Sequence, residues 1–545
     1  MTCGGEDILP AAFLFWNTRQ PLRQGPETRA PARNSAILSS IVPRRPLLLA
    51  ALAAVALAVF GRGVIFMAPG VRFDADQAVV GLMAKHISEG RAFPLYFYGQ
   101  DYLLALEAYA AAPVMWLLGP TEVALKLPVL AMNVVAAVLI AWHAARGVGL
   151  TPGLAAASAL PFALPPIVIG SRLMDAMGGN VETPFYAMVL WTLRGRRWAF
   201  AIVTAVALAH RELVAYPLAA LLVLDVVRGG WRSRATLTRW AATAAAVVVL
   251  QGGLHLVRPH AAMFGPGTAA RNYDTMLSSA EVVRGQICLD ASQWPARAQA
   301  LAFEHLPLMA GGLPGPLVDL GISSGMGQGR PGLWGWTLGL VIAGVFAGAV
   351  AHRPWSASLG PRAATAAADT APATWLPAFL LLCGLASIGV YGFVSCTNIS
   401  THTLRYDLLV AFVPAGALVA GLRHGARMVR AGLVTALLVA VWPAADDYRA
   451  LAAEIARGQW PDPRGQVVEA LAARGPAAYW GDFRVAYLLT FRGAERFTIA
   501  SIEHQRIEDY ATRAQARNAG VVKVAACDGG TRLADGVWLC PPGTR

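Results

Sequence analysis

Two aspartates, Asp74 and Asp76, follow the first long apolar segment and are the side chains best placed for acid–base chemistry. A carboxylate at a membrane–water boundary costs free energy unless a partner or a reaction uses it. One of the two could act as a general base that takes a proton from an acceptor hydroxyl while a leaving group departs. The alternative is structural. Asp74 would cap a helix predicted over residues 77–89, Gln77 would complete a capping-box-like pair, and Asp76 would lie where the helix dipole favours an anion. The two interpretations are compatible, because a cap also fixes a base in place.

The residues that follow add polar and aromatic groups to the same segment. Aromatic rings beside amide and carboxylate groups suit sugar recognition, and they also occur in the aromatic belts of membrane interfaces. Glu107 lies in an apolar helix predicted over residues 103–118, where an ionisable group is a functional candidate by default. Its alternative is a paired residue that faces water. The candidate sugar- or acceptor-binding residues of this segment are Tyr98, Gln100, Asp101, Tyr102 and Glu107.

Membrane helices must position these groups. The chain has 545 residues, of which 56% are hydrophobic and only 14% are charged. Soluble proteins usually carry about 25% charged residues. The sequence therefore predicts an integral membrane protein. The net charge of +13 comes from basic residues in short loops between apolar segments, as the positive-inside rule predicts, and it does not indicate a nucleic-acid partner.

The apolar segments predict an all-α polytopic protein with about eleven transmembrane helices, each judged against the roughly 20 residues needed to cross a bilayer. Arg44 and Arg45 precede the first one, which places the N-terminus in the cytoplasm. Residues 1–44 are predicted to be a disordered cytoplasmic tail. The predicted membrane domain is 45–444, with outer loops at 68–120 and 258–331. The predicted spans are 46–67, 121–143, 152–171, 183–194, two short spans within 198–228, 237–257, 332–351, 374–394, 407–421 and 431–444.

Residues 445–545 are predicted to form a small extracytoplasmic α/β domain. Short strands are predicted near 478–480, 497–500 and 521–524, with helical patterns between them. Cys527 and Cys540 could form a disulfide there if this end faces an oxidising compartment, and two free thiols are the alternative. None of the six cysteines has the spacing of a metal site.

Several short motifs give the chain a family resemblance over about residues 45–545. It resembles the bacterial GT-C glycosyltransferases and, more narrowly, the branch related to protein O-mannosyltransferases (family 39). The motifs are Phe73-Asp74-Ala75-Asp76-Gln77, Tyr98-Gly99-Gln100, Leu106-Glu107-Ala108-Tyr109, Asn180-Val181-Glu182-Thr183, Arg405-Tyr406-Asp407-Leu408 and Tyr479-Trp480-Gly481-Asp482. Through this resemblance Glu182 joins the candidate sugar- or acceptor-binding residues.

The resemblance implies a GT-C-like hexosyltransferase in the bacterial inner (plasma) membrane. Such an enzyme moves a sugar from a polyprenyl-phosphate-linked donor to an acceptor glycan, lipid or protein, with inversion. The base would be Asp76 or Asp74. The family's acidic pair is Asp followed by Glu, whereas Gln77 follows Asp76 here. A divalent metal, which some members use, is the candidate cofactor, and Gln77 weakens the case for it.

The leaving polyprenyl phosphate requires a cationic partner, and Arg suits phosphate through bidentate hydrogen bonds. Arg405 is the first candidate, followed by Arg172 and Lys85. Their alternative is snorkelling of a long cation to the interface. Glu304 and His305 in the second outer loop could form a metal-binding or acid–base pair, although a solvated loop pair is the favoured interpretation.

A membrane transporter or lipid flippase is the alternative function. A transporter should contain repeated halves and charges near the bilayer midplane. The sequence contains no convincing repeat, and its acidic residues gather at the outer mouth. A membrane scaffold without activity is a third hypothesis, for which Gln77 is the one indication.

Overall fold

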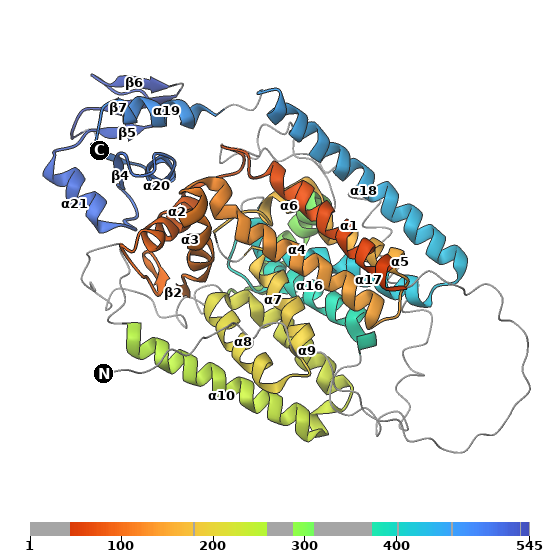
Figure 1. The fold of residues 1–545 in the computed structure, drawn as a ribbon. Coiled ribbons are helices and arrows are strands. Elements are labelled where there is room, and N and C mark those ends of the chain that lie inside the picture. Colours follow the sequence, from red (N-terminus) through yellow and green to blue (C-terminus); the bar gives the residue numbers. More distant parts are fainter. Residues whose placement is uncertain are drawn as a thin grey trace, which may run out of the picture. The chain divides into compact units, whose positions relative to one another are not determined.

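The long apolar segments form helices, because in a bilayer each backbone N–H and C=O group must be satisfied within its own segment. The computed structural model describes residues 44–177, 180–258, 287–309, 373–400, 403–458, 462–534 and 536–543. Six helices in these ranges are long and apolar enough to cross a membrane. They are α1 (Arg44–Ile65), α4 (Glu122–Arg146), α10 (Arg234–Val257), α16 (Leu376–Phe393), η9 (Thr403–Ala411) continued by α17 (Phe412–His424), and α18 (Arg427–Ala456) (Figure 1). The chain is a polytopic membrane protein, as predicted.

Shorter helices occupy the other predicted spans. The span predicted at 152–171 is divided into α5 (Pro152–Ala163) and α6 (Ile167–Arg172), because Pro165 and Pro166 cannot continue a helix. The predicted break within 198–228 separates α8 (Arg197–His210) from η1 (Glu212–Val214) and α9 (Ala215–Val227), while α7 is Glu182–Leu193. The span predicted at 332–351 lies outside the described residues, so the count of eleven stays a prediction. Residues 1–43 lie outside them as well.

Several helix ends that the predicted topology places on the same side of the membrane contact one another in the structure. At the start of α10, the Arg239 side chain pairs with Asp225 near the end of α9 and donates to the Arg194 carbonyl after α7, at 2.8 Å. The Arg228 guanidinium lies 5.6 Å from the centre of the Trp375 ring, in η8 (Ala373–Trp375) before α16. These contacts agree with the alternation of the helices, and the side of the membrane on which they lie stays a prediction.

The first outer loop is a compact helical unit rather than an extended connection. It contains α2 (Ala75–Ser88), a short antiparallel pair of β1 (Tyr96–Phe97) and β2 (Gln100–Leu104), and α3 (Leu106–Leu118). α2 packs on α3 and on α20 (Phe483–Arg492) of the C-terminal segment, so the red-brown and blue parts of Figure 1 meet there. Gly81 permits this approach, because a Cβ atom at that position would lie 2.6 Å from the Phe491 ring.

The C-terminal segment contains a five-stranded mixed sheet in the order β4-β3-β5-β7-β6. β3 (Ala478–Gly481) pairs in parallel with β4 (Thr498–Ser501) and β5 (Val521–Lys523), which are the three strands that the sequence predicts. β7 (Val537–Cys540) runs antiparallel to β5 and to β6 (Thr531–Ala534). α19 (Pro463–Ala472), α20 and α21 (Glu508–Ala516) accompany the sheet. The predicted boundary at 444/445 falls inside α18, and the division into two domains stays a prediction.

Two disulfides join segments predicted to lie on the outer face. Cys527 and Cys540 are bonded at the end of the sheet. A second bond joins Cys288 to Cys396, which the sequence analysis did not pair. It holds the chain before η5 (Ala291–Gln293) and α12 (Trp294–Ala300) against the chain that follows α16. In the described part of the second outer loop, η6 (Leu301–His305) and α13 (Leu306–Met309) follow α12. η2 (Gly230–Arg232) precedes α10.

Candidate active site

Asp74 caps α2 as the sequence predicts. Its backbone is extended, and its carboxylate accepts a hydrogen bond from the Gln77 N–H at 3.0 Å. The capping-box prediction is wrong for the Gln77 side chain, which is fully buried and turns toward the chain between α6 and α7. Its amide donates to the Arg72 carbonyl at 3.2 Å and accepts from the Ala176 N–H at 3.1 Å. Buried backbone groups require such partners, so Gln77 ties the first outer loop to the chain between α6 and α7.

Asp76 lies in the first turn of α2 and takes no part in the cap. Its Oδ2 is 3.8 Å from an Arg405 Nη1, and 36% of its side chain is exposed. Burial and the neighbouring Asp74 carboxylate raise the pKa of Asp76, whereas the charges of Arg405 and Arg506 oppose this rise. Water moderates the effect of burial because the group is partly accessible. Asp76 is therefore a more basic carboxylate than an isolated aspartate and is open to a substrate.

Arg405 stands at the start of the helix that leads into α17. Besides Asp76, its guanidinium lies 3.5 Å from the Met177 sulfur and donates to the Tyr406 hydroxyl at 3.1 Å. The structure thus brings together the predicted base and the first predicted phosphate ligand, from segments far apart in the sequence. Electrostatic attraction between two such groups persists where water is partly excluded.

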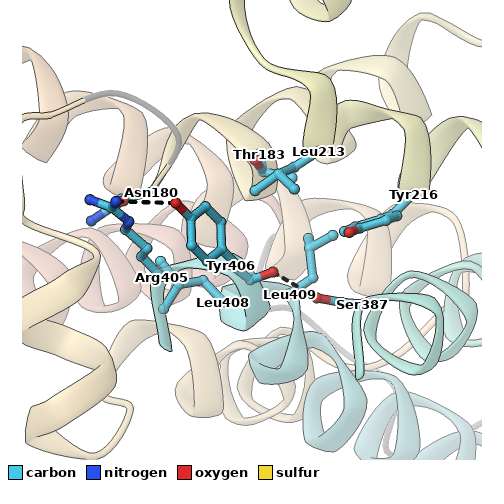
Figure 2. Close-up of a pocket in the computed structure, with 9 residues that line it drawn as sticks. All are labelled: Asn180, Thr183, Leu213, Tyr216, Ser387, Arg405, Tyr406, Leu408 and Leu409. Carbon is cyan, nitrogen blue, oxygen red and sulfur yellow. Dashed lines mark hydrogen bonds between the residues drawn. The ribbon is translucent and has the colours of Figure 1, made fainter. Parts of the chain in front are cut away.

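A small pocket opens beside Arg405. The space between its lining atoms is about 170 Å³, part of which is open solvent, and it is too narrow to admit a water molecule in this conformation. Figure 2 shows Arg405 and Asn180 near one end and leucine and tyrosine side chains along the rest. The lining residues are Asn180, Thr183, Leu213, Tyr216, Ser387, Arg405, Tyr406, Leu408 and Leu409. A cation beside leucine and tyrosine side chains suits a ligand with an anionic head and a hydrocarbon tail, and the pocket has to widen to admit such a ligand.

Arg172, the second predicted phosphate ligand, is engaged in a buried network. Its side chain is 3% exposed and its Nη1 lies 3.3 Å from the Asp175 carboxylate. The Arg72 guanidinium donates to the same carboxylate from two nitrogens, at 3.2 Å each. Burial raises the pKa of Asp175, while the Arg72 charge opposes this. Direct contact between Arg172 and a donor phosphate would require this network to open.

Lys85 is not at this site. It lies nine residues beyond Asp76 on α2, which is about 14 Å along a helix axis. Its ammonium pairs with Glu495 at 2.7 Å and with Glu89 at 2.6 Å, and its side chain is 8% exposed. The structure does not bring Lys85 together with Arg405, because α20 and the turn after it cover that end of α2, and a contact of Lys85 with the donor phosphate stays a prediction.

Burial also removes three of the predicted sugar-binding residues from the surface. Tyr98 is fully buried, and its hydroxyl lies 3.1 Å from the His86 Nδ1, so it packs against α2 and does not stack on a ligand. Glu107 at the start of α3 and Glu182 at the start of α7 are buried as well. Gln100 is half-buried beside the turn at Gly99. Asp101 and Tyr102 lie in β2, but their side chains are outside the described part of the structure.

Other residues that shape the site escaped the sequence analysis. Lys126 of α4 is fully buried and donates to the carbonyls of Phe66, Val71 and Arg72 at 2.7 to 3.1 Å. It fixes the chain that leads to Asp74. A lone lysine inside an apolar span is a signal that could have identified it. Arg506, from the C-terminal segment, donates to the Gly99 carbonyl at 2.8 Å. No local pattern indicates that it reaches the first outer loop.

A divalent metal fits this site poorly. No group of three or more His, Cys, Asp or Glu side chains that could hold a metal occurs in the described residues. Asp74 and Asp76 are the carboxylates at the start of α2, and the Gln77 side-chain oxygen already accepts from the Ala176 N–H. Hard cations require several oxygen ligands. We therefore derive no catalytic step through a metal ion.

Neither the protein-family models nor the curated proteins contain a match to this sequence. Solved structures do resemble it. ArnT from Cupriavidus metallidurans bound to undecaprenyl phosphate is 13% identical, with 90% of this chain and 97% of that chain covered and a TM-score of 0.53. The Archaeoglobus fulgidus oligosaccharyltransferase in complex with Zn and sulfate is 12% identical, with 87% and 68% covered and a TM-score of 0.49. AglB from the same organism, with an inhibitory peptide and a dolichol-phosphate, is 12% identical, with 88% and 70% covered and a TM-score of 0.47.

The similarity to ArnT extends over nearly the whole of both chains. The protein therefore has the fold of the GT-C glycosyltransferases, as the sequence motifs predict. The narrower relationship to protein O-mannosyltransferases stays a prediction. At this level of identity the likeness defines the fold, and the activity has to be argued from the site.

Proposed function

We propose that the protein is a membrane glycosyltransferase that moves a sugar from a polyprenyl-phosphate-linked donor to an acceptor hydroxyl at the outer face of the bacterial inner membrane. The observation that carries this proposal is the approach of Asp76 to Arg405, 3.8 Å apart, beside a mainly apolar pocket. An acid–base group and a phosphate ligand thus lie within the dimensions of one donor headgroup. The ArnT structure with undecaprenyl phosphate supports a carrier of this class.

Asp76 is the proposed general base. Its carboxylate takes the proton of the acceptor hydroxyl as the acceptor oxygen forms a bond to the anomeric carbon. The bond between that carbon and the phosphate oxygen breaks, and its electron pair leaves with the polyprenyl phosphate. A single displacement of this kind inverts the anomeric centre. Asp74 is less suited to the role, because its carboxylate is occupied by the Gln77 N–H.

Arg405 is the proposed ligand of the departing phosphate. Negative charge develops on the phosphate as the bond breaks, and a guanidinium in a partly desolvated site stabilises it strongly. The side chain of Arg405 is 22% exposed, so it can contact a ligand without leaving its place. Leu408, Leu409 and Tyr406 line the pocket beside it and offer apolar contact to the first units of the carrier.

The test uses membranes that contain the full chain, a labelled polyprenyl-phosphate sugar and endogenous acceptors. Asp76→Asn and Arg405→Ala should each lower sugar transfer by about 100-fold or more. Asp446→Asn, at an exposed carboxylate on α18, is the control and should transfer at the wild-type rate. Full activity of Asp76→Asn would refute the assignment of the base. Movement of labelled lipid across the bilayer without any sugar transfer would favour the transporter or flippase.

A further inference from the structure

A buried histidine–aspartate pair lies behind the pocket. The His305 Nε2 is 3.1 Å from the Asp407 Oδ2, and the two side chains are 1% and 0% exposed. The favoured sequence interpretation, a solvated pair of Glu304 and His305, is wrong, because Glu304 is exposed and His305 faces inward. Burying two ionisable groups is expensive, and apolar residues of similar size often serve stability as well. The proposed reaction uses neither group, so the pair requires another explanation.

Asp407 occupies the kink of the segment that carries Arg405. The helical turn η9 is interrupted there, with φ −122° and ψ 23° at Asp407. Arg405 and Tyr406 precede the kink, Leu408 and Leu409 follow it, and all four line the pocket (Figure 2). The backbone angles at Asp407 therefore determine the direction of the Arg405 side chain relative to Leu408 and Leu409.

His305 is itself held in an unusual element. It ends the π-helical turn η6, and such turns occur frequently at functional sites. Its ring centre lies 4.9 Å from that of Tyr391, whose hydroxyl is 2.7 Å from the Thr403 Oγ1. Thr403 begins the same segment, so His305 supports that segment near its start and at its kink.

Two further connections fix the loop that presents His305. The Cys288–Cys396 disulfide joins it covalently to the chain before η9. The Arg297 guanidinium donates to the carbonyls of Tyr391, Gly392 and Thr397 at 2.6 to 3.0 Å. These bonds connect residues 287–309 to the chain that leads into the segment with Arg405. They therefore fix the position of His305 relative to that segment.

We infer that His305 is a positioning residue for the donor-phosphate ligand, acting through Asp407 to aim Arg405 at the pocket. This inference rests on the proposed function. The hydrogen bond holds the kink at Asp407, and the kink directs the Arg405 side chain toward Asp76 and the pocket. Removing the bond should therefore weaken donor binding even though His305 itself touches no substrate.

The experiment compares His305→Leu, which removes the ring nitrogen donor, with His305→Gln, which retains an N–H near the Nε2 position. Sugar transfer is measured against the concentration of a labelled polyprenyl-phosphate donor. We expect the donor KM of His305→Leu to rise about tenfold, the effect of losing one positioning hydrogen bond, and that of His305→Gln to stay within about threefold. The kcat should fall less than the KM rises. An equal loss in both variants, or a loss in kcat alone, would overturn the inference.

Asp225→Asn is the matched control, because Asp225 is a buried carboxylate paired with Arg239 at the other ends of the helices. It should lower thermal stability in detergent without changing the donor KM. If it raises the donor KM as much as His305→Leu does, the His305 effect is general destabilisation and the inference fails.

A double-mutant cycle with Arg405→Ala separates positioning from folding. His305→Leu should weaken transfer in the wild-type background and have no further effect once Arg405 is absent. The same fold-change in both backgrounds would refute the action through Arg405.

If the wild-type protein transfers no sugar, the proposed function fails, and the thermal stabilisation of the protein by undecaprenyl phosphate then tests the inference about His305. It holds if His305→Leu and Arg405→Ala reduce that stabilisation alike, and it fails if His305→Leu leaves it unchanged.

Discussion

Asp76 and Arg405 form an ion pair in which the nearest nitrogen and oxygen atoms are 3.8 Å apart. A charge-assisted hydrogen bond between such groups is usually 2.7 to 2.9 Å long. The longer separation leaves hydrogen-bonding capacity on both side chains, and each remains partly exposed. The pair comes from α2 and from the segment before α17, so the site depends on how the ends of helices far apart in the sequence are assembled.

Replacing Asp74 and Asp76 by asparagine should affect sugar transfer differently. Asp76→Asn removes the proposed base and should lower transfer by about 10² to 10⁴-fold. Asp74→Asn keeps a good helix cap and should retain activity within a few-fold. Since the Asp74 carboxylate raises the pKa of Asp76, its neutralisation lowers that pKa, and the acid limb of the pH–rate profile should move to lower pH. Rates of sugar transfer measured from pH 4 to 8 check this. An acid limb that does not move in Asp74→Asn would contradict the effect of the Asp74 charge on the pKa of Asp76.

Arg506→Gln should shift the same profile in the opposite direction. The Arg506 charge opposes the rise in the pKa of Asp76, so removing the charge raises this pKa. The acid limb should then move to higher pH, while the glutamine can still donate to the Gly99 carbonyl. Arg513→Gln on α21, an exposed arginine paired with Asp509, is the control and should leave the limb in place. An acid limb that stays in place or moves to lower pH in Arg506→Gln would contradict the action of this charge on Asp76.

Local patterns in the sequence predict the elements of the site better than their contacts. The cap by Asp74 follows from the residues that adjoin it, and the helices follow from length and hydropathy. The partners of Gln77, the contact of Arg506 with Gly99 and the Cys288–Cys396 bond depend on residues brought together by folding. Spacing alone does not determine disulfide connectivity among six cysteines.

The errors of sequence interpretation have one common cause. Lys85 and Tyr98 look accessible in a loop sequence, but the C-terminal segment packs on α2 and buries them. His305 follows an exposed glutamate, yet its side chain faces inward to Asp407. Burial by a distant part of the chain is invisible to a window of neighbouring residues.

Gln77 should be intolerant of the acidic residue found in the related family. Gln77→Glu keeps an acceptor for the Ala176 N–H, but it loses the donor to the Arg72 carbonyl and places a charge in a buried position. The cost should be about 1 to 3 kcal/mol of folding stability, the penalty for a buried group that loses its partner. Thermal unfolding in detergent measures this.

The matched control is Gln293→Glu, at an exposed glutamine in the second outer loop. It should unfold at the wild-type temperature. If Gln77→Glu is as stable as this control, the contact of Gln77 with Ala176 contributes little to stability, and the family's acidic pair would be tolerated here.

Both disulfides should be present in protein isolated from the membrane, if the outer face is an oxidising compartment. A maleimide that adds mass should react with Cys288, Cys396, Cys527 and Cys540 only after reduction and denaturation. Labelling of these four cysteines in denatured protein without a reductant would contradict the extracytoplasmic placement of both segments. The background for this measurement carries both Cys3→Ser and Cys383→Ser, because these are the two of the six cysteines that lie outside the two disulfides.

Glu495 connects the C-terminal segment to the helix that carries the proposed base. Its carboxylate lies 2.7 Å from the Lys85 ammonium and 2.6 Å from an Arg91 nitrogen, and it accepts from the Tyr510 hydroxyl at 2.6 Å. Burial alone would raise the pKa of Glu495, but hydrogen bonds from His86, Arg91 and Lys85 hold it well below its usual range. Ala494 and Glu495 both have positive φ, at 50° and 60°. This backbone costs about 1 kcal/mol or more per residue, so the contacts must hold the turn in place.

Glu495→Gln should therefore lower folding stability by about 2 to 3 kcal/mol at pH 7, because it breaks a largely buried ion pair. A carboxyl group with a lowered pKa stabilises the fold above its unfolded pKa of about 4.3, and this contribution is lost as the pH falls below that value. The difference from wild type should thus shrink between about pH 5 and pH 3 in denaturant unfolding. Glu469→Gln, at an exposed carboxylate paired with Arg496, should differ little from wild type at either pH. A difference for Glu495→Gln that does not change with pH would mean that its packing, and not its charge, anchors the C-terminal segment to α2.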